Sequence, residues 1–125
     1  MTMNNPARVL IVEDERVVAR DLERRLQGLG YVIVGLVGTG TEAIHQALEH
    51  RPDLILMDIR LQGQMDGIEA VSSIRKCAHI RIVYMSAYID ETTLARARAT
   101  EPDAFLHKPF NAYSLQATLQ QVLPS

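Results

Sequence analysis

The side chains best suited to chemistry in this sequence are three carboxylates, a hydroxyl and an ammonium: Glu13, Asp14, Asp58, Ser86 and Lys108. Carboxylates packed together repel one another, so each gains from a nearby cation. Mg²⁺ takes oxygen ligands and usually keeps waters that a substrate phosphate can replace. A carboxylate beside such an ion can attack phosphorus and form an acyl phosphate. The ammonium would neutralise charge, and the hydroxyl would hydrogen-bond a phosphoryl oxygen.

Short apolar runs must position these side chains. Five such runs are predicted to be strands: Arg8–Val12, Tyr31–Leu36, Asp53–Met57, Arg81–Met85 and Asp103–Leu106. Continuous apolar runs of this length are typical of strands buried on both faces of a parallel sheet. The acidic pair follows the first run, Asp58 ends the third, Ser86 follows the fourth and Lys108 follows the fifth.

Segments with helical spacing of apolar residues separate the strands. The first carries Val18, Leu22, Leu26 and Leu29 and is expected to end at Gly28 and Gly30. The next two begin at residues spaced as capping boxes, Thr39 with Glu42 and Asp66 with Glu69. A fourth helix is predicted over Asp90–Thr100, and Asn111 is expected to cap the fifth.

Strands and helices that alternate in this way predict an α/β fold, a doubly wound five-stranded parallel sheet with five helices on its two faces. Ligands bind such sheets beyond the carboxyl ends of the strands. If the first, third, fourth and fifth strands are neighbours, the five polar side chains meet at one site. Each residue alone has a simpler interpretation, for example a helix start for Glu13-Asp14 or a turn for Lys108-Pro109. Their joint placement at strand ends favours the functional interpretation.

Length and composition limit the alternatives. The chain has 125 residues, a net charge of −2 and one cysteine, Cys77. We therefore expect a single domain over residues 7–125, a disordered tail at 1–6 and no internal disulfide. The net charge gives no global indication of nucleic-acid binding, which would favour a basic patch. No apolar run reaches the roughly 20 residues that span a bilayer, so a cytoplasmic protein without membrane insertion is expected.

Four motifs carry a resemblance to a known family: VLIVEDE (9–15), DLILMDIRLQGQMDGIEA (53–70), IVYMSAY (82–88) and FLHKPF (105–110). In order and spacing they resemble the receiver domain of bacterial and archaeal response regulators, from residue 8 to about 123. The resemblance implies a flavodoxin-like fold with strand order 2-1-3-4-5. It also implies a phosphorelay signalling function, in which a sensor histidine kinase or histidine phosphotransfer protein donates a phosphoryl group from a phosphohistidine.

The family's metal and acceptor roles fall on four residues of this chain. Asp58 matches the phosphoacceptor. Asp14 and Asp58 match the carboxylates on Mg²⁺ (or Mn²⁺), and Glu13 matches the acid that binds the ion through water. The backbone carbonyl of Arg60 matches a further metal ligand. The resemblance thus implies a signalling receiver that catalyses its own phosphorylation and dephosphorylation, and no other enzyme activity.

The family's switch roles fall on four more residues. Ser86 matches the switch hydroxyl, Phe105 the aromatic whose rotamer follows it, and Lys108 the cation that holds the phosphoryl group. The Lys108–Pro109 bond matches one that the family keeps cis. Phosphorylation is expected to change the surface of the fourth helix, fifth strand and fifth helix, where an effector would bind. The thin apolar face of Asp90–Thr100 agrees with a movable helix.

Three residues and one loop distinguish this chain from many receivers. Arg60 and Tyr88 occupy the variable positions that flank the phosphoryl group, and both are bulky. We hypothesise that they hinder the attacking water and lengthen the phosphorylated state. Tyr113 stands where many receivers fused to DNA-binding domains carry an arginine used in dimer ion pairs, so the sequence does not support that dimer. The loop after Asp58 lacks a common proline and is one residue longer than in the chemotaxis receiver.

Three other functions fit parts of the sequence. Gly38–Ala43 fits the G-x-G-x-x-A pattern of dinucleotide binding, but it follows the second strand and leaves Asp14 and Lys108 unused. A Mg²⁺-dependent aspartyl phosphatase commonly needs a second acid two residues after the nucleophile. Arg60 occupies that position, so phosphatase turnover should be poor. A degenerate receiver used only for docking disagrees with the intact site.

No output domain is recognisable, and whether the chain stands alone or is part of a larger protein stays open. Direct DNA binding is not expected.

Overall fold

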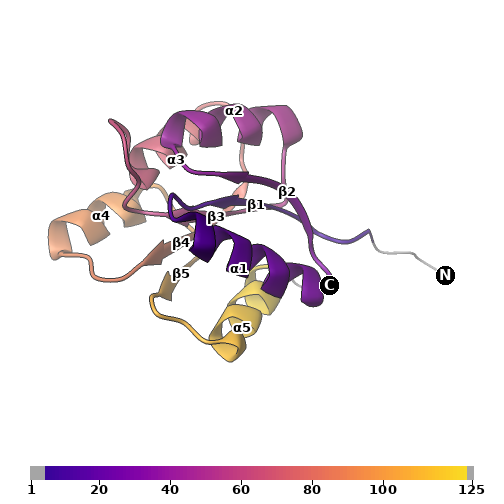
Figure 1. Cartoon of the computed structure of the whole chain (residues 1–125). Helices are drawn as coiled ribbons and strands as arrows, with labels where there is room; N and C mark the ends of the chain where they lie inside the picture. Colours follow the sequence, from indigo (N-terminus) through magenta and orange to yellow (C-terminus); the bar gives the residue numbers. More distant parts are fainter. Residues whose placement is uncertain (1–4, 124–125) are drawn as a thin grey trace.

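Five strands and five helices alternate along the chain in the computed structural model, which describes residues 5–123 (Figure 1). The strands are β1 (Arg8–Val12), β2 (Val32–Val37), β3 (Leu54–Asp58), β4 (Arg81–Ser86) and β5 (Ala104–His107). The helices are α1 (Arg16–Gly28), α2 (Gly40–His50), α3 (Gly67–Arg75), α4 (Glu91–Ala99) and α5 (Ala112–Val122). The predicted strands are all present, with bounds shifted by one residue at most.

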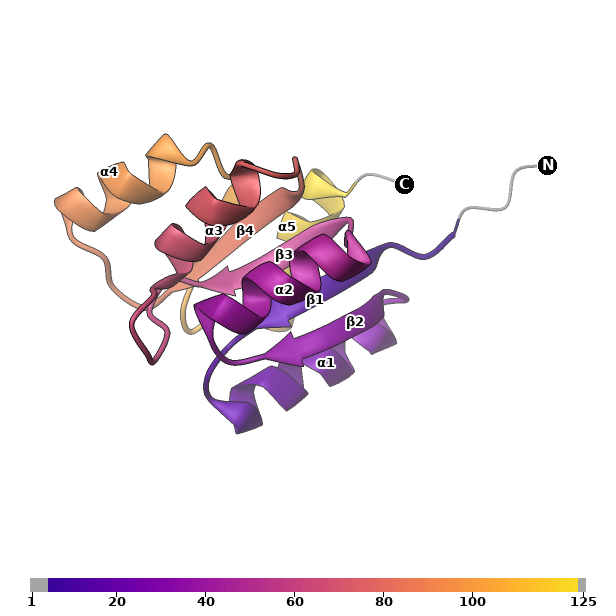
Figure 2. The ribbon, with the colours of Figure 1, turned by 90° about the horizontal axis from the view of Figure 1, so that it is seen from above.

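The strands form one parallel sheet in the order β2-β1-β3-β4-β5 (Figure 2). This order confirms the predicted flavodoxin-like topology. It places β1, β3, β4 and β5 next to one another, which is the condition for their carboxyl ends to form one site. Every residue of β3 is buried, as the continuous apolar run Leu54–Met57 predicts for a central strand.

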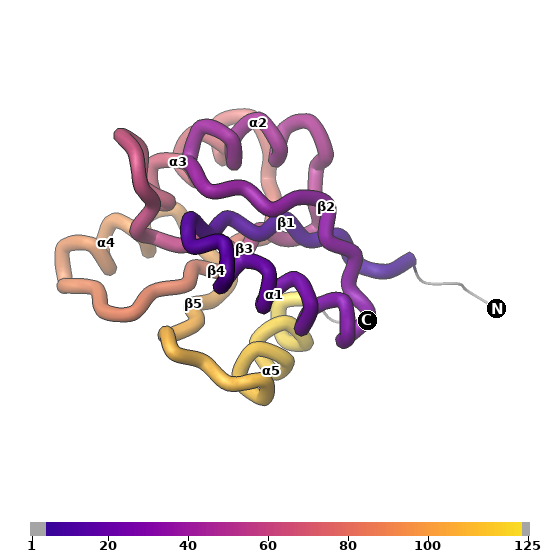
Figure 3. Tube along the Cα trace, in the orientation of Figure 1, coloured from indigo at the N-terminus to yellow at the C-terminus, as the bar shows by residue number. Residues whose placement is uncertain are grey.

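Helices cover both faces of the sheet. Alternate strand residues such as Ile11 and Leu56 pack with α1 and α5, whereas Leu10 and Ile55 pack with α2 and α3 on the opposite face. The Cα trace shows α1 and α5 together on one side of the sheet (Figure 3). Side chains of a strand point alternately to its two faces, so each buried strand contributes to both halves of the core.

Polar side chains fix the beginnings of the helices. Asp66 and Glu69 form the predicted reciprocal capping box at the start of α3. The Thr39 side chain accepts a hydrogen bond from the backbone N–H of Glu42, as predicted. The Glu42 carboxylate accepts from the Thr39 hydroxyl and not from the Thr39 backbone N–H, so the capping box is only half formed. Asn111 caps α5 as predicted. These bonds satisfy N–H groups that have no partner inside a helix.

The tail predicted at residues 1–6 falls largely outside the described residues; Asn5 and Pro6 are exposed and belong to no helix or strand. Within residues 5–123, no helix has both the length and the apolar character needed to cross a membrane.

Candidate functional site

The five polar residues singled out in the sequence all lie at the carboxyl end of the sheet. Backbone hydrogen bonds extend the strand pairing beyond the strands themselves: Glu13 N–H donates to Val37 (2.9 Å) and Lys108 N–H to Ser86 (2.6 Å). Asp58 and Ser86 are the last residues of β3 and β4. The strand ends are therefore held in register, which fixes the backbone positions from which the site side chains extend.

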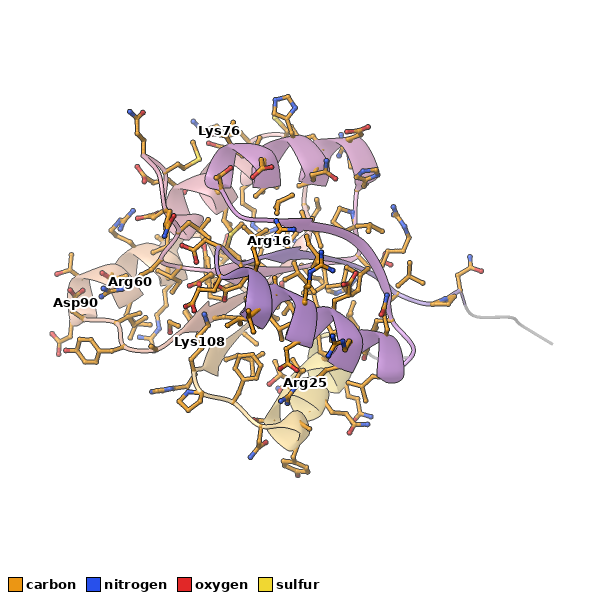
Figure 4. The ribbon with its side chains drawn as sticks, viewed as in Figure 1. Arg16, Arg25, Arg60, Lys76, Asp90 and Lys108 are labelled. Atoms are coloured by element: carbon orange, nitrogen blue, oxygen red, sulfur yellow. The ribbon has the colours of Figure 1, made fainter. Side chains whose placement is uncertain are left out.

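The Lys108 ammonium joins two of the carboxylates. Its Nζ lies 2.7 Å from Glu13 Oε1 and 3.0 Å from Asp58 Oδ2, and Figure 4 shows this side chain reaching toward the strand ends from the segment after β5. The Glu13 side chain is fully buried and that of Asp58 is 9% exposed. Burial alone would lower the pKa of Lys108, but the hydrogen bonds to Glu13 and Asp58 outweigh it, and the pKa is raised. Lys108 is therefore a permanent cation at neutral pH.

The three carboxylates form a cluster. Ligand oxygens of Glu13, Asp14 and Asp58 all lie within 4.8 Å of one another. Three anions thus face one ammonium. Water can do little to screen the excess negative charge, because the side chains of Glu13 and Asp58 are buried. Charge of this kind is relieved by a hard cation with oxygen ligands. The donor set fits a divalent ion such as Mg²⁺.

Backbone amides position each carboxylate. Glu13 Oε2 accepts from Glu15 N–H at 3.1 Å, and Asp58 Oδ1 accepts from Arg60 N–H at 3.1 Å. Asp14 Oδ2 accepts from Gln62 N–H at 3.2 Å, which ties the loop after β3 to the loop after β1. The carboxylates thus order the loops around them, and Arg60 already lies against Asp58 through its backbone.

The remaining predicted residues differ in exposure and in their contacts. Ser86 is partly exposed at the end of β4, and Phe105 packs its ring against Tyr84, with ring centroids 5.7 Å apart. The Lys108–Pro109 peptide bond is cis. Tyr88 is 73% exposed. The Arg60 side chain is exposed and lies toward α4, near Asp90 (Figure 4).

Gly67 is a site residue that the sequence analysis missed. It is buried at the start of α3, and its N–H donates to Ile59 O at 2.9 Å. A Cβ at this position would lie 2.1 Å from the carbonyl oxygen of Asp58 and 2.9 Å from Met57 Cγ. Only glycine lets α3 begin this close to the backbone of Asp58. The Asp66-Gly67 pair in a loop was the available signal, but it does not reveal which backbone atom comes close.

The Gly38–Ala43 motif has a structural explanation. Gly38 lies beside the backbone of Asp14, where a Cβ would be 3.5 Å from the Asp14 Cα, and Gly40 begins α2 against Met65. The two glycines therefore let the turn between the outer strand β2 and α2 pack closely against the loops that carry Asp14 and Met65.

A cleft of about 380 Å³ opens beside the site, between α1 and the segment that joins β5 to α5. Val18, Leu22 and Phe110 give it apolar walls, while Lys108 and Glu15 lie among its polar lining. Lys108 therefore borders both the carboxylate cluster and this cleft.

Comparison with known proteins places the chain in a family. Residues 9–120 match the family model described as the response regulator receiver domain. The transcriptional regulatory protein PdtaR of Mycobacterium tuberculosis is 41% identical over 110 residues, 88% of this chain and 53% of that protein. The phyllosphere-induced regulator PhyR of Methylorubrum extorquens is 38% identical over 116 residues, 92% of this chain and 43% of that protein. The chain thus spans about half the length of these relatives.

Solved structures agree with the sequence relatives. The signal receiver domain of a modulated diguanylate cyclase from Desulfovibrio desulfuricans superposes with a TM-score of 0.88 at 34% identity, covering 95% of this chain and 94% of that one. The chemotaxis protein CheY4 of Vibrio cholerae superposes with a TM-score of 0.87 at 29% identity, covering 95% of this chain and all of that one. The family match over 9–120, the shared topology and the relatives lead to one conclusion: the chain belongs to the response regulator receiver domains of two-component signalling systems.

Proposed function

We propose that this receiver accepts a phosphoryl group on Asp58, with Mg²⁺ (or Mn²⁺) held by Asp14, Asp58 and the Arg60 carbonyl and with Glu13 acting through water. The observation that carries the proposal is the Lys108 ammonium between Glu13 and Asp58, at 2.7 and 3.0 Å, inside a cluster of three carboxylates. The ion would screen the charge that accumulates as an anionic donor approaches this acidic site.

The donor would be a phosphohistidine on a sensor histidine kinase or histidine phosphotransfer protein. An Asp58 oxygen attacks phosphorus and forms a P–O bond while the P–N bond of the donor breaks. The electron pair stays on the ring nitrogen that carried phosphorus, and because the other ring nitrogen already carries a proton, neutral imidazole leaves. Each Asp58 oxygen accepts one hydrogen bond among the described residues, from Arg60 N–H or from Lys108, so each keeps a lone pair. Lys108 then pairs with the phosphoryl oxygens, because transfer of this kind depends on positioning and charge neutralisation.

The phosphoryl group would act as a switch. Ser86 ends the strand next to Asp58, and its hydroxyl would turn toward a phosphoryl oxygen; Phe105 would follow on the adjacent strand. The effector surface would then be α4, β5 and α5, with α4 the element most free to move because Ala97 is its one buried residue. Relatives named as transcriptional regulators would carry such a signal to separate output regions.

Arg60 and Tyr88 would set how long the signal lasts. Both side chains are exposed and belong to the loops that follow β3 and β4, and they would flank a phosphoryl group on Asp58. We propose that they restrict the attacking water. Arg60→Ala with Tyr88→Ala should speed loss of phosphate, measured as decay of phosphoprotein after donor removal, relative to Tyr113→Ala as the matched exposed-tyrosine control. An unchanged decay rate refutes this role.

The acceptor chemistry can be tested by intact mass after incubation with acetyl phosphate. The wild-type protein should gain one phosphoryl group with Mg²⁺ and none with EDTA. Asp58→Asn should gain none, whereas Asp21→Asn, an exposed acid on α1, should behave as the wild type. Absence of an adduct in the wild type, together with absence of any spectral change on adding beryllofluoride and Mg²⁺, would reject the proposal.

A further inference from the structure

Polar contacts, more than apolar packing, hold α4 to the rest of the domain. Ala97 is its one buried residue, and Leu94 is half-buried. The other α helices each bury at least three residues. An element with so little buried apolar surface is the one whose position a single hydrogen bond can influence.

One such hydrogen bond comes from Tyr84 on β4. Its side chain is fully buried, and its hydroxyl lies 2.7 Å from Thr100 Oγ1, just after α4. The Thr100 hydroxyl donates to the carbonyl oxygen of Ala97 at 2.6 Å. Since that hydroxyl has a single proton, its oxygen accepts from Tyr84. The order is therefore Tyr84 to Thr100 to Ala97, a relay from the central sheet into the last turn of α4.

The same tyrosine touches the aromatic residue of the proposed switch. The rings of Tyr84 and Phe105 have centroids 5.7 Å apart with their planes tilted by 33°. Tyr84 and Phe105 are paired neighbours on β4 and β5, and Ser86 follows two residues later on the same face of β4. Tyr84 thus lies between the proposed switch residues and α4.

A second anchor lies nearby and is independent of Tyr84. Arg75, the last residue of α3, donates to the carbonyl oxygens of Thr100 and Glu101, both at 3.2 Å, and also to Ile80. These bonds hold the backbone after α4 to α3. The Tyr84 bond is different, because it joins the helix end to the sheet and to Phe105.

We propose that the Tyr84–Thr100 hydrogen bond is a latch that holds α4 in the unphosphorylated position and thereby sets how readily the domain switches. The proposal rests on the function proposed above. A displaced Phe105 ring forces the packed Tyr84 ring to move, and a hydrogen bond tolerates little change in distance or angle. Opening the latch is then part of the switching transition, and its strength raises the cost of the active conformation.

Tyr84→Phe removes the hydroxyl and keeps the ring. Because the latch then no longer opposes switching, a phosphoryl analogue should bind more tightly, by the factor that one net hydrogen bond represents, about 2- to 10-fold. Thr100→Val should act in the same direction. Thr100→Val also removes the bond to Ala97, so the double variant should show little beyond Thr100→Val alone, because that substitution already removes the Tyr84 bond. Tyr113→Phe is the matched control, since Tyr113 is 80% exposed.

Two measurements test the latch. Hydrogen exchange of α4 amides, without phosphodonor, should be about 2- to 10-fold faster in Tyr84→Phe and unchanged in α3 and in Tyr113→Phe. The beryllofluoride midpoint with Mg²⁺ should fall by a similar factor. Unchanged α4 exchange overturns the latch.

The outcomes also separate this inference from the proposed function. Faster α4 exchange with an unchanged midpoint leaves Tyr84 as a structural anchor and overturns its regulatory role. If beryllofluoride fails to bind the wild type, the proposed function fails, and the regulatory role falls with it. The exchange result still decides whether Tyr84 holds α4.

Discussion

Asp14→Asn should stabilise the metal-free protein, although it alters the proposed metal site. Asp14 differs from the other two carboxylates because Lys108 does not bond it; its described partner is Gln62 N–H at 3.2 Å. An asparagine side-chain oxygen can accept the same bond. The substitution therefore removes repulsion from Glu13 and Asp58 and leaves both Lys108 bonds in place.

The magnitude follows from the cluster geometry. Two unit charges 4.8 Å apart repel by about 3.5 kcal/mol at an effective dielectric constant of about 20. Asp14 has two such neighbours, and the Lys108 ammonium offsets roughly one of them. Partial exposure of Asp14 screens the remainder further. We expect the free energy of unfolding to rise by about 1 to 2 kcal/mol in EDTA.

Urea unfolding followed by circular dichroism measures this change. Saturating Mg²⁺ should stabilise the wild type, because an ion that binds only the folded state adds to its stability. It should stabilise Asp14→Asn much less, so the order of the two proteins should reverse between EDTA and Mg²⁺. Glu49→Gln, an exposed charge loss on α2, should leave both conditions unchanged. An Asp14→Asn protein that is less stable than the wild type in EDTA would show that the three carboxylates do not repel as their distances require.

Three further predictions concern neighbouring groups. Lys108→Met should lower the free energy of unfolding in EDTA by about 3 to 5 kcal/mol, because the buried carboxylates of Glu13 and Asp58 lose their ammonium partner. A loss below about 1 kcal/mol contradicts this. Burial raises the pKa of Tyr84 to about 12, so between about pH 10 and 12 the folded state keeps a proton that the unfolded state releases. The free energy of unfolding should therefore fall as the pH rises through this range. In Tyr84→Phe, urea unfolding at a series of alkaline pH values should show a smaller fall. Gly67→Ala should destabilise the domain and slow phosphorylation by acetyl phosphate.

Sequence patterns predicted the elements that burial dictates. The runs Arg8–Val12 and Asp53–Met57 are apolar almost throughout, and the strands they form are central and almost fully buried. Placing Glu13, Asp58 and Lys108 at strand ends then required only the topology, because parallel strands bring their carboxyl ends to one edge. The sequence could not show how Lys108 divides its bonds between the two acids, since that depends on rotamers in the packed site.

The role of Tyr84 was hidden for a different reason. Within the run Arg81–Met85 a tyrosine is an ordinary β-former, and its hydroxyl partner, Thr100, is 16 residues away. A buried phenol must find a partner, but local pattern does not name it. The half-formed capping box at Thr39 shows the same limit on a smaller scale: residue spacing was correct, while the bond actually formed by Glu42 depends on its rotamer.

Gly67 shows how a backbone contact can control the position of the proposed acceptor, Asp58. The loop after Asp58 returns so closely that an added Cβ would lie 2.1 Å from the Asp58 carbonyl oxygen, a backbone atom that cannot turn aside as a side chain could. Gly67→Ala must therefore move α3 or the end of β3, and we expect a loss of about 1 to 3 kcal/mol in stability from this overpacking. Displacement of Asp58 should slow acetyl phosphate transfer by more than the lost stability explains, because transfer depends on positioning. Gly28→Ala is the control, since a Cβ added at Gly28 would meet nothing within 4 Å. If Gly67→Ala were phosphorylated at the wild-type rate, the close approach of α3 would have no part in positioning Asp58.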